Sequence, residues 1–510
     1  MLPEIPVLAD YGVSPTTGFL PEVLPLTRLP DPYYHKWEAI VADLQALILS
    51  RRIRAVADRL PVLSTVGLEH DAEWRRAYSL LCFMAHAYIW GGDSPAEKLP
   101  RSISAPLMEV SKRLELPPVA TYAALCLFNF RPIVSDEPID DLENLATLNT
   151  FTGSLDESWF YLVSVAIEAR GAPIIPIMMT AIAAARRGDA RTVTLCLRSF
   201  AERLTDLTAI LLRVHENCDT SIFYHRIRPF LAGSKNMAEA GLPNGVMYED
   251  ADGKVEYRQY SGGSNAQSTL IQFFDVILGI QHRPTGEKPA AGAATAPDRS
   301  GPTPRHGFIA EMRDYMPRDH ARFLEDVGRV ANIRTFVESR TDNPELCLAF
   351  DACLAMLSAF RDRHIAIVTR YVVMKAREAR ERGRSGSPQA TRQRVNLATV
   401  STKNQQERGS KDDADGASGK KLKGTGGTSL LPFLKQARDE TGEPAIAEWT
   451  RVFMNKKGKK VGASGDEPLK TRQPELESGP VPLDGATDGV NGLAASWELD
   501  DELGGGVCNY

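Results

Sequence analysis

The chain has 510 residues and a formal net charge of −5, and 43% of its residues are hydrophobic and 25% charged. The hydrophobic fraction is sufficient for a core and excludes a wholly disordered protein. The mild acidity argues against a dedicated nucleic-acid binder, whose surface would be basic. At roughly 150 residues per domain, the length alone suggests about three domains.

Cysteine usage and the chain start indicate the compartment. Seven cysteines are scattered along the chain without a C-x-x-C pair, which is typical of free thiols in a reducing environment. The start, MLPEIPVLADYG, lacks both a basic leader and an apolar segment. The longest nearly apolar run, residues 173–185, is too short to span a bilayer. We expect a cytoplasmic protein with no membrane partner and no nucleic-acid partner.

The predicted elements begin after a Pro-rich, extended strap. From Trp37 onward, apolar residues recur at spacings of three and four, the pattern that buries one face of a helix. Similar helical stretches follow at 71–91, 104–114, 118–130, 157–185, 190–216, 266–281, 319–338 and 344–379. Strand-like alternation is scarce, and its best candidate is a hairpin near 246–249 and 255–257. The sequence therefore predicts an all-α fold.

Composition changes mark the domain organisation. Residues 283–306 are rich in Pro, Gly and Ala, and residues 380–423 are polar with few apolar side chains, so we expect mobile loops there. Gly, Pro, Lys and Asp dominate 437–510, which predicts a disordered C-terminal tail. The first estimate of three domains then reduces to a small N-terminal helical domain at 1–150 and a large helical domain at 151–436.

The motifs of common active sites are missing from the sequence. It contains no Walker-type phosphate loop, no dinucleotide fingerprint on a strand and no H-E-x-x-H. None of the nine histidines lies within four residues of another, so helical histidine pairs that bind iron or zinc are missing too. Haem is a different case, because the porphyrin supplies four ligands and the protein needs to give only one axial residue.

His364 is the histidine best placed for that role. It shares one apolar helix face with Phe360, Ile367 and Tyr371, and Arg361 lies one turn earlier. An arginine there could pair with a haem propionate, since its planar fork suits carboxylates. The alternative is a satisfied core histidine, and periodicity alone favours that alternative.

A resemblance to a known family changes this balance. The supporting stretches are FYLVS at 160–164, FYHRIR at 223–228, GLPNGVMYE at 241–249, GGSNAQS at 262–268, FDVILGIQ at 274–281, YMPRDH at 315–320, HIAIVTRY at 364–371, and GTGGT at 424–428 before LLPFL at 430–434. Each stretch is weak alone, but together and in this order the chain resembles the indoleamine 2,3-dioxygenase family, in a fungal-type form with a longer tail. The resemblance covers about residues 5 to 436.

The resemblance implies a haem enzyme with its cofactor between the two helical domains. Such an enzyme binds one b-type haem and uses ferrous iron to activate O₂, and an electron donor keeps the iron reduced. It inserts both oxygen atoms across the C2–C3 bond of the indole of L-tryptophan or a related indoleamine, giving N-formylkynurenine in the kynurenine pathway. The cofactor carries the hard chemistry while the protein binds, orients and excludes water. The resemblance also implies a monomer.

On the cofactor side, the resemblance assigns a role to five residues. His364 is the proximal iron ligand, and Arg361 and Asp275 are polar partners on the propionate and proximal side. Ser264 and Ala266 lie in the segment over the distal face of the haem, where Ser264 also faces the substrate.

On the substrate side, the resemblance makes Ser164 the distal-pocket serine and Arg228 the residue that grips the substrate carboxylate. Thr425 is placed by the ammonium group, in a Gly-rich loop at 424–428 that folds over the substrate. The aromatic wall against the indole is formed by Tyr122, Phe160 and Phe223. Without the resemblance, the aromatic residues would be plain core, Arg228 an exposed helix arginine and the loop a linker end.

Some positions depart from the commoner family pattern. Asn265 and Ala266 stand where many members have Ala-Gly, and Ile271 replaces a frequent aromatic residue. Ser234 replaces a frequent tryptophan, and Tyr161 a phenylalanine. One methylene in an apolar pocket is worth about 1–3 kcal/mol, so these changes affect the preferred indole and the rate. They leave open a haem-binding sensor or low-turnover paralogue, and a haem-free helical protein that acts through its tail.

Overall fold

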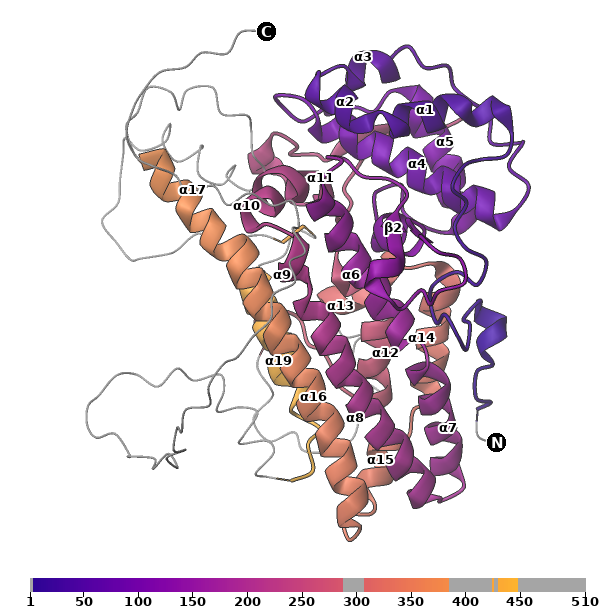
Figure 1. Cartoon of the computed structure of the whole chain (residues 1–510), viewed down its shortest axis with the longest axis vertical. Coiled ribbons are helices and arrows are strands. Elements are labelled where there is room, and N and C mark those ends of the chain that lie inside the picture. The colour runs from indigo at the N-terminus through magenta and orange to yellow at the C-terminus, as the bar shows by residue number, and fades with distance from the viewer. Residues whose placement is uncertain (1–2, 288–306, 385–423, 426–429, 448–510) are drawn as a thin grey trace, which may run out of the picture. The chain divides into compact units, whose positions relative to one another are not determined.

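The computed structural model describes residues 3–287, 307–384, 424–425 and 430–447. Helices make up most of these residues, as the sequence predicts (Figure 1). The helices of the N-terminal part are α1 (His35–Ala42), α2 (Leu44–Leu49), α3 (Ile53–Ala57), α4 (Asp71–Trp90) and α5 (Arg101–Leu114). The longer helices that follow are α6 (Leu155–Gly171), α7 (Ile174–Arg186), α8 (Ala190–Leu212), α12 (Thr269–Leu278), α14 (Arg318–Val330), α16 (Pro344–Val368), α17 (Met374–Arg384) and α19 (Leu430–Thr441). Shorter ones are α9 (Val214–Asn217), α10 (Thr220–Ile222), α11 (Arg228–Leu231), α13 (Phe308–Glu311) and α15 (Ile333–Glu338).

Side-chain caps fix where the long helices begin. Ser154 accepts a hydrogen bond from the backbone N–H of Glu157 at the start of α6, and Asp189 caps α8 in the same way. Asn343 caps α16, and Pro344 occupies its first turn, where no N–H is needed. The single helical stretch predicted at 157–185 is two helices, because α6 ends just before Pro173 and α7 begins after it.

Two small antiparallel sheets interrupt the helices. The predicted hairpin is confirmed as β3 (Val246–Glu249) paired with β4 (Val255–Arg258), with Tyr248 opposite Glu256. The second pair, β1 (Phe130–Pro132) and β2 (Leu145–Thr147), has strands of three residues, which are too short for an alternating pattern to reveal.

The core runs along the long helices. α8 and α16 lie side by side, and the Cys353 thiol donates to the Leu197 carbonyl oxygen at 3.0 Å between them (Figure 1). One stretch of the described chain, Leu155–Arg186, is long and apolar enough to cross a membrane, but it comprises α6 and α7 and 78% of its apolar window is buried inside the fold. Those two helices therefore have the properties of core helices.

His86 of α4 braces two distant segments. Its Nδ1 donates to the Phe230 carbonyl oxygen at 2.7 Å, and its Nε2 accepts from the Ala120 N–H at 3.0 Å. Burial lowers the pKa of His86 to about 4, which keeps the ring neutral with one donor and one acceptor nitrogen. Trp90, one turn later, donates to the Ala232 carbonyl oxygen at 2.9 Å. α4 thus fixes the chain beside residues 120 and 230, where the site lies.

The boundaries predicted from composition need one correction. α19 runs across the expected start of the tail at residue 437, and its residues Ala437, Arg438, Glu440 and Thr441 are buried. Polar side chains can be buried when they are paired, so a polar composition does not exclude a packed helix. The packed chain therefore extends past residue 437.

Most of 283–306 and 380–423, and the tail from 448, lie outside the described residues. All described residues belong to one compact unit, Met1–Lys459, and the division near residue 150 stays a prediction.

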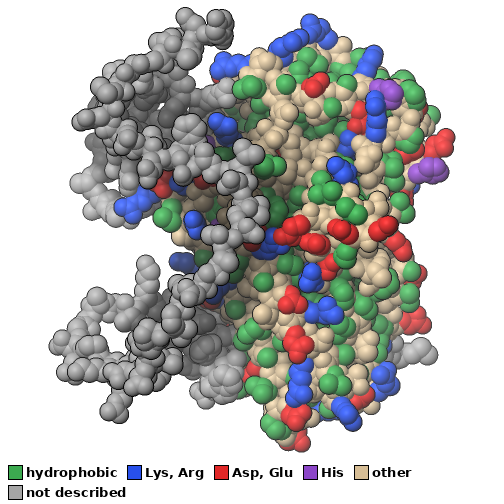
Figure 2. Space-filling model, in the orientation of Figure 1, with side chains coloured by type: hydrophobic (Ala, Val, Ile, Leu, Met, Phe, Trp, Pro, Cys, Tyr) green, Lys and Arg blue, Asp and Glu red, His purple; other side chains and the backbone are tan. Residues whose placement is uncertain are grey.

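The described surface in Figure 2 carries acidic and basic side chains close to one another, as the small net charge of −5 implies. Buried ion pairs are a different matter. Arg76 of α4 contacts Glu38 of α1 at 2.6 and 3.1 Å and the Asn149 side chain at 3.1 Å, and Glu38 also accepts from the Leu29 N–H. This cluster ties the N-terminal strap, α1 and α4 together.

Replacing Arg76 with Met should reveal the stabilising effect of this cluster. The change leaves the Glu38 carboxylate buried without its partner, which costs about 3–5 kcal/mol. Chemical denaturation of both proteins measures this loss of unfolding free energy. Arg51→Met is the matched control, because the Arg51–Asp93 pair is 55% and 66% exposed, and breaking it should cost less than about 1 kcal/mol. Equal effects of the two substitutions would contradict this interpretation.

Candidate functional site

The site residues predicted from the sequence all line one cavity. It is lined by α6, α12, α16, α19 and the segment 263–268, and most of its wall is apolar. The predicted residues on its wall are Tyr122, Phe160, Ser164, Phe223, Arg228, Ser264, Ala266, Asp275, Arg361, His364 and Thr425. Residues that are far apart in sequence therefore come together in space, although geometry alone does not assign their roles.

Irregular helical turns position three of the cavity walls. Tyr122 precedes the π-helical turn Ala123–Leu127, and Phe223 begins and Arg228 follows another at Phe223–Ile227. A third turn, Thr369–Val373, directly follows α16. Such turns insert an extra residue into a helix, and they occur frequently at functional sites. In the helical stretch predicted at 118–130, the structure has the short π-helical turn Ala123–Leu127.

His364 presents a neutral imidazole to the cavity. It makes no hydrogen bond to any residue that the structure describes, in contrast to the fully satisfied His86. Burial and the nearby Arg361 lower the pKa of His364 to about 4. At neutral pH the ring is therefore unprotonated, and a lone pair is available to a metal ion.

Arg361 and Asp275 form a buried ion pair beside His364. Both Asp275 oxygens accept from the Arg361 guanidinium, at 2.6 and 2.8 Å, and Arg361 also donates to the Ala437 carbonyl oxygen at 3.3 Å and to the Thr441 hydroxyl. Burial alone would raise the pKa of Asp275, but Arg361 and His282 lower it below its ordinary value. The pair joins α12, α16 and α19 at one end of the cavity.

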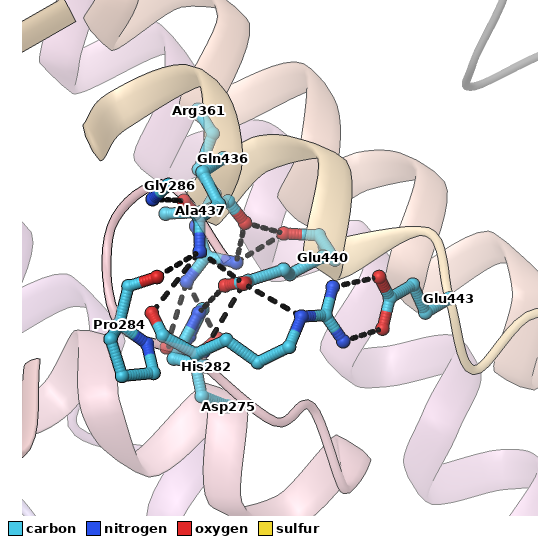
Figure 3. A network of polar contacts seen from close by, with 11 residues as sticks. Asp275, His282, Pro284, Gly286, Arg361, Gln436, Ala437, Glu440 and Glu443 are labelled. Atoms are coloured by element: carbon cyan, nitrogen blue, oxygen red, sulfur yellow. Dashed lines mark hydrogen bonds and ion pairs between the residues drawn. The ribbon is translucent and has the colours of Figure 1, made fainter. Parts of the chain in front are cut away.

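Further polar contacts connect this pair to α19 and to Glu443, which follows it (Figure 3). His282 donates from Nε2 to Asp275 at 3.0 Å and from Nδ1 to Glu440 at 2.7 Å. Burial alone would lower the pKa of His282, but the two carboxylates raise it above its ordinary value and so favour the protonated ring. The Arg283 guanidinium pairs with Glu443, which adds a further link between this loop and α19.

The opposite part of the cavity is aromatic. The Phe160 and Phe223 rings lie 4.7 Å apart between centroids, and Phe223 contacts Tyr371 at 5.6 Å. The Tyr371 hydroxyl donates to the Cys218 carbonyl oxygen at 2.7 Å, which fixes its ring. Rigid aromatic faces of this kind bind a flat apolar ligand at a small cost in conformational entropy.

Arg228 is the cationic group on this side of the cavity. Its guanidinium lies over the Tyr224 ring, 5.8 Å from the centroid, and burial lowers its pKa from the ordinary value. An arginine remains protonated even so. A buried planar guanidinium can bind a carboxylate with two parallel hydrogen bonds.

The backbone is tightly crossed where Thr425 meets the cavity. The Gly233 and Gly262 N–H groups both point to the Thr425 carbonyl oxygen, and the Thr425 hydroxyl donates to the Gly263 carbonyl oxygen at 2.9 Å. A Cβ atom at Gly233 or Gly262 would overlap the other strand of this crossing. Only glycine allows such an approach. Residues 426–428 of the Gly-rich loop that we expect to fold over the substrate lie outside the described residues.

The segment 264–266 forms a short turn beside this crossing. The Ser264 hydroxyl accepts from the Ala266 N–H at 3.3 Å, and the Ala266 carbonyl oxygen accepts from the Gln272 side chain at 2.9 Å. Asn265 and Ile271, two of the departures noted in the sequence, also line the cavity. Ser234 is buried, but it contacts the backbone around residue 258 to 260 instead.

Several cavity residues were not predicted from the sequence. Leu430, Phe433 and Leu434 of α19 line the cavity, and Glu168 lies buried behind Tyr122. The available signal for Glu168 was a lone acid in the apolar run of α6. His282 and Glu440 had no local signal, because they meet across 158 residues of chain.

These features define a class of protein: a helical enzyme with a largely apolar cavity whose wall carries one neutral histidine, His364, and two arginines, Arg228 and Arg361. Comparison with known proteins agrees. The family model described as indoleamine 2,3-dioxygenase matches residues 7–444. The indoleamine 2,3-dioxygenase of Saccharomyces cerevisiae is 42% identical over 448 residues, which cover 86% of this chain and 93% of that protein.

Two further fungal proteins are similar over most of their length. Indoleamine 2,3-dioxygenase nanC of Aspergillus nanangensis is 40% identical, and the match covers 85% of this chain and 96% of that protein. The 6-hydroxytryptophan 2,3-dioxygenase fscD of Fusarium equiseti is 36% identical, with coverages of 86% and 97%. This chain belongs to the indoleamine 2,3-dioxygenase family, the haem dioxygenases of tryptophan catabolism.

The donor set of the cavity fits haem. Across residues 3–287, 307–384, 424–425 and 430–447, no group of three or more His, Cys, Asp or Glu side chains is placed to hold a metal ion. A site made only of side chains would need such a group, whereas a porphyrin needs one axial donor. His364 is a neutral donor on the wall of an apolar cavity, which meets that requirement.

Replacing His282 with Gln should destabilise the docking of α19 in a pH-dependent way. Because the pKa of His282 is raised in the folded protein, its charge stabilises the fold fully below the ordinary histidine value of about 6.5. This stabilisation is lost as pH rises through the raised pKa. The difference in unfolding free energy between the two proteins should therefore be larger at about pH 6 than at about pH 9. A difference independent of pH would show that the His282 charge has no effect.

Proposed function

We propose that this enzyme inserts both atoms of O₂ across the C2–C3 bond of the indole of L-tryptophan, forming N-formylkynurenine. The observation that carries the proposal is that His364, Arg228 and the Phe160–Phe223 wall face one apolar cavity. One cavity wall therefore carries a ligand for the cofactor, a cation for the substrate carboxylate and an apolar surface for the indole. The three fungal relatives described above are named as indoleamine or 6-hydroxytryptophan dioxygenases, which supports an indole amino acid as substrate.

His364 is assigned as the axial ligand of one haem b, held between the N-terminal part and the long helices. When bound, haem supplies the iron at which O₂ is activated. The Arg361–Asp275 pair fixes the helix that carries His364 against α12 and α19. Burial and the Arg361 guanidinium both favour the neutral state of His364, because a nearby cation disfavours protonation of the imidazole.

Arg228 binds the substrate carboxylate, and the aromatic wall of Tyr122, Phe160 and Phe223 orients the indole. This division of labour places the polar end of the amino acid at the guanidinium and its ring at the apolar surface. Holding the ring in one orientation lowers the entropic part of the reaction barrier.

Ser164, Ser264 and Thr425 supply the few neutral polar groups of the cavity. Ser164 lies one helical turn from Phe160 on α6, and Thr425 closes the glycine crossing beside Ser264. We assign Thr425 to the substrate ammonium group and Ser164 and Ser264 to the distal side, where Ala266 limits the space. Enclosure by the segment at Thr425 excludes water, so reactive oxygen is kept for the indole.

The remaining partners follow from this chemistry. The reaction needs O₂ and an electron donor that keeps the iron ferrous. The cysteines at 82, 126, 196, 218, 347 and 353 are unpaired in the described chain, in agreement with the cytoplasmic location that we propose. We assign the protein as a monomer.

Substrate preference tests the proposed pocket directly. Reduced, haem-loaded protein under air should convert L-tryptophan faster than D-tryptophan or tryptamine, and 6-hydroxy-L-tryptophan shows whether the Asn265 amide favours a hydroxylated ring. Product absorbance measures each rate. Stable haem binding without product from any of these compounds would contradict the enzyme proposal and favour a haem-binding sensor.

Replacing His364 with Ala should abolish the Soret band of the purified protein, while the circular dichroism of the helices remains. Added imidazole should restore part of the band, because it replaces the missing axial donor. His35→Ala is the control, since His35 is exposed on α1 and should leave the spectrum unaltered. An unchanged Soret band in the His364 variant would exclude His364 as the ligand.

Replacing Arg228 with Met should raise the KM for L-tryptophan by about 100-fold, because a charge-assisted double hydrogen bond is lost. The KM for tryptamine, which has no carboxylate, should change little. Steady-state kinetics with both substrates separates the two cases. If both substrates lose affinity equally, Arg228 shapes the cavity but does not bind the carboxylate.

A further inference from the structure

Glu168 is a buried acid that the proposed reaction does not use. It lies on α6 one turn after Ser164 and two turns after Phe160, both of which line the cavity. Its residue surface is only 1% exposed. A carboxyl group is rarely buried to this extent without a compensating cation.

The contacts of Glu168 are uneven. Its Oε1 accepts from the Tyr122 hydroxyl at 3.1 Å and from the Ser268 hydroxyl at 2.7 Å. Its Oε2 is buried with no hydrogen-bond partner. Tyr122 and Ser268 line the cavity, so the carboxyl is one hydrogen bond away from the space that we assign to the indole. Buried polar atoms are usually satisfied, which makes Oε2 the natural place for a proton.

Glu157, on the same helix, gives the contrast. It is also fully buried and accepts from a tyrosine of the cavity wall, Tyr161, at 2.9 Å. However, the backbone N–H groups of Phe151 and Thr152 donate to its two oxygens at 2.8 and 2.7 Å. Glu157 thus has the donors that hold a carboxylate, whereas Glu168 has two hydroxyls on a single oxygen.

The surroundings of Glu168 favour titration near neutrality. Burial raises the pKa of Glu168 to about 7, although the hydrogen bonds from Ser268 and Tyr122 oppose this rise. The titratable groups that face it are the Tyr122 hydroxyl and the Cys126 thiol, and the pKa of each is itself raised by burial and by the Glu168 charge. Neither group is ionised at neutral pH.

The other charged or titratable groups on the cavity wall do not titrate in the same range. Arg228 and Arg361 remain cationic, and Asp275 is held ionised by Arg361 and His282. The pKa of His364 is lowered to about 4. Behind the cavity wall, Glu168 has a pKa of about 7, and the pKa values of His282, which contacts Asp275, and of Glu157, which contacts Tyr161, are also raised. The Glu168→Gln variant therefore identifies the part of the pH dependence that belongs to Glu168.

The geometry points to Glu168 as a positioning residue that takes up a proton from solvent when the indole binds against Tyr122. This inference rests on the proposed function, because it requires an indole amino acid in the cavity. A bound ring displaces water from the wall that Tyr122 and Ser268 form, so the ionised carboxyl loses solvation and the neutral form is favoured. The neutral acid, protonated on Oε2, still accepts from the Tyr122 hydroxyl through Oε1 and holds the phenol ring against the substrate.

The sign of the effect follows from linkage. If binding raises the Glu168 pKa by about one unit, affinity is highest below the pKa of the free protein and falls about tenfold as pH rises through the pKa of the complex. Loss of this titration should leave the affinity independent of pH.

The experiment is an equilibrium titration of L-tryptophan into haem-loaded, reduced protein under carbon monoxide, followed by the Soret band. Carbon monoxide prevents turnover, so the dissociation constant is measured without catalysis. Between about pH 6 and about pH 8.5, the dissociation constant of the native protein should rise about tenfold, and that of Glu168→Gln by less than about twofold.

Two tyrosine variants make the test specific. Tyr122→Phe removes one of the bonds that lower the Glu168 pKa, so the midpoint of the pH dependence should move to higher pH. Tyr161→Phe is the matched control: it removes a hydroxyl that contacts Glu157, and the midpoint should not move.

The outcomes separate the two proposals. A pH-independent dissociation constant of the native protein, or an equal pH dependence in Glu168→Gln, overturns the role of Glu168 while leaving the proposed function standing. If none of these haem-loaded proteins, the native one included, shows a tryptophan-dependent Soret shift, the proposed substrate is wrong, and this inference is wrong with it.

Discussion

The structure around the cavity depends on the buried pair between Asp275 and Arg361. Its two short contacts hold α12 and α16 together, and the same guanidinium reaches the backbone of α19. A buried ion pair is costly unless its remaining hydrogen bonds are satisfied. Here His282 satisfies the outer Asp275 oxygen and is itself balanced by Glu440. Helix α19 is thereby coupled to the wall that carries His364.

The two sides of the cavity have different chemistry because their polar groups are arranged differently. On the His364 side, burial and the Arg361 guanidinium keep the imidazole neutral, and Asp275 pairs with that guanidinium. On the indole side, Arg228 is cationic and the aromatic rings are apolar, and the buried Glu168 lies behind Tyr122. Opposing electrostatic environments within one space are typical of active sites.

The sequence predicted the helical class, the β3–β4 hairpin and eleven of the residues that line the cavity. Helical periodicity is a local signal, so it predicts α4, α8 and α16. The motifs that contain Arg228 and His364 identify the protein family. Composition placed the tail start at 437, inside α19, because it cannot detect that Arg438 and Glu440 are paired and buried. The role of Glu168 was not predicted either, because its partners Tyr122 and Ser268 lie far from it in the sequence.

If the proposed function is correct, both oxygen atoms of one O₂ molecule enter the indole amino acid at this cavity. Mass spectrometry of the product formed under a mixture of ¹⁸O₂ and ¹⁶O₂ measures this. We expect N-formylkynurenine molecules that carry two heavy oxygens or none, when analysed before exchange with water. Product with a single heavy oxygen as the main labelled species, or no labelled product, would contradict the proposed function.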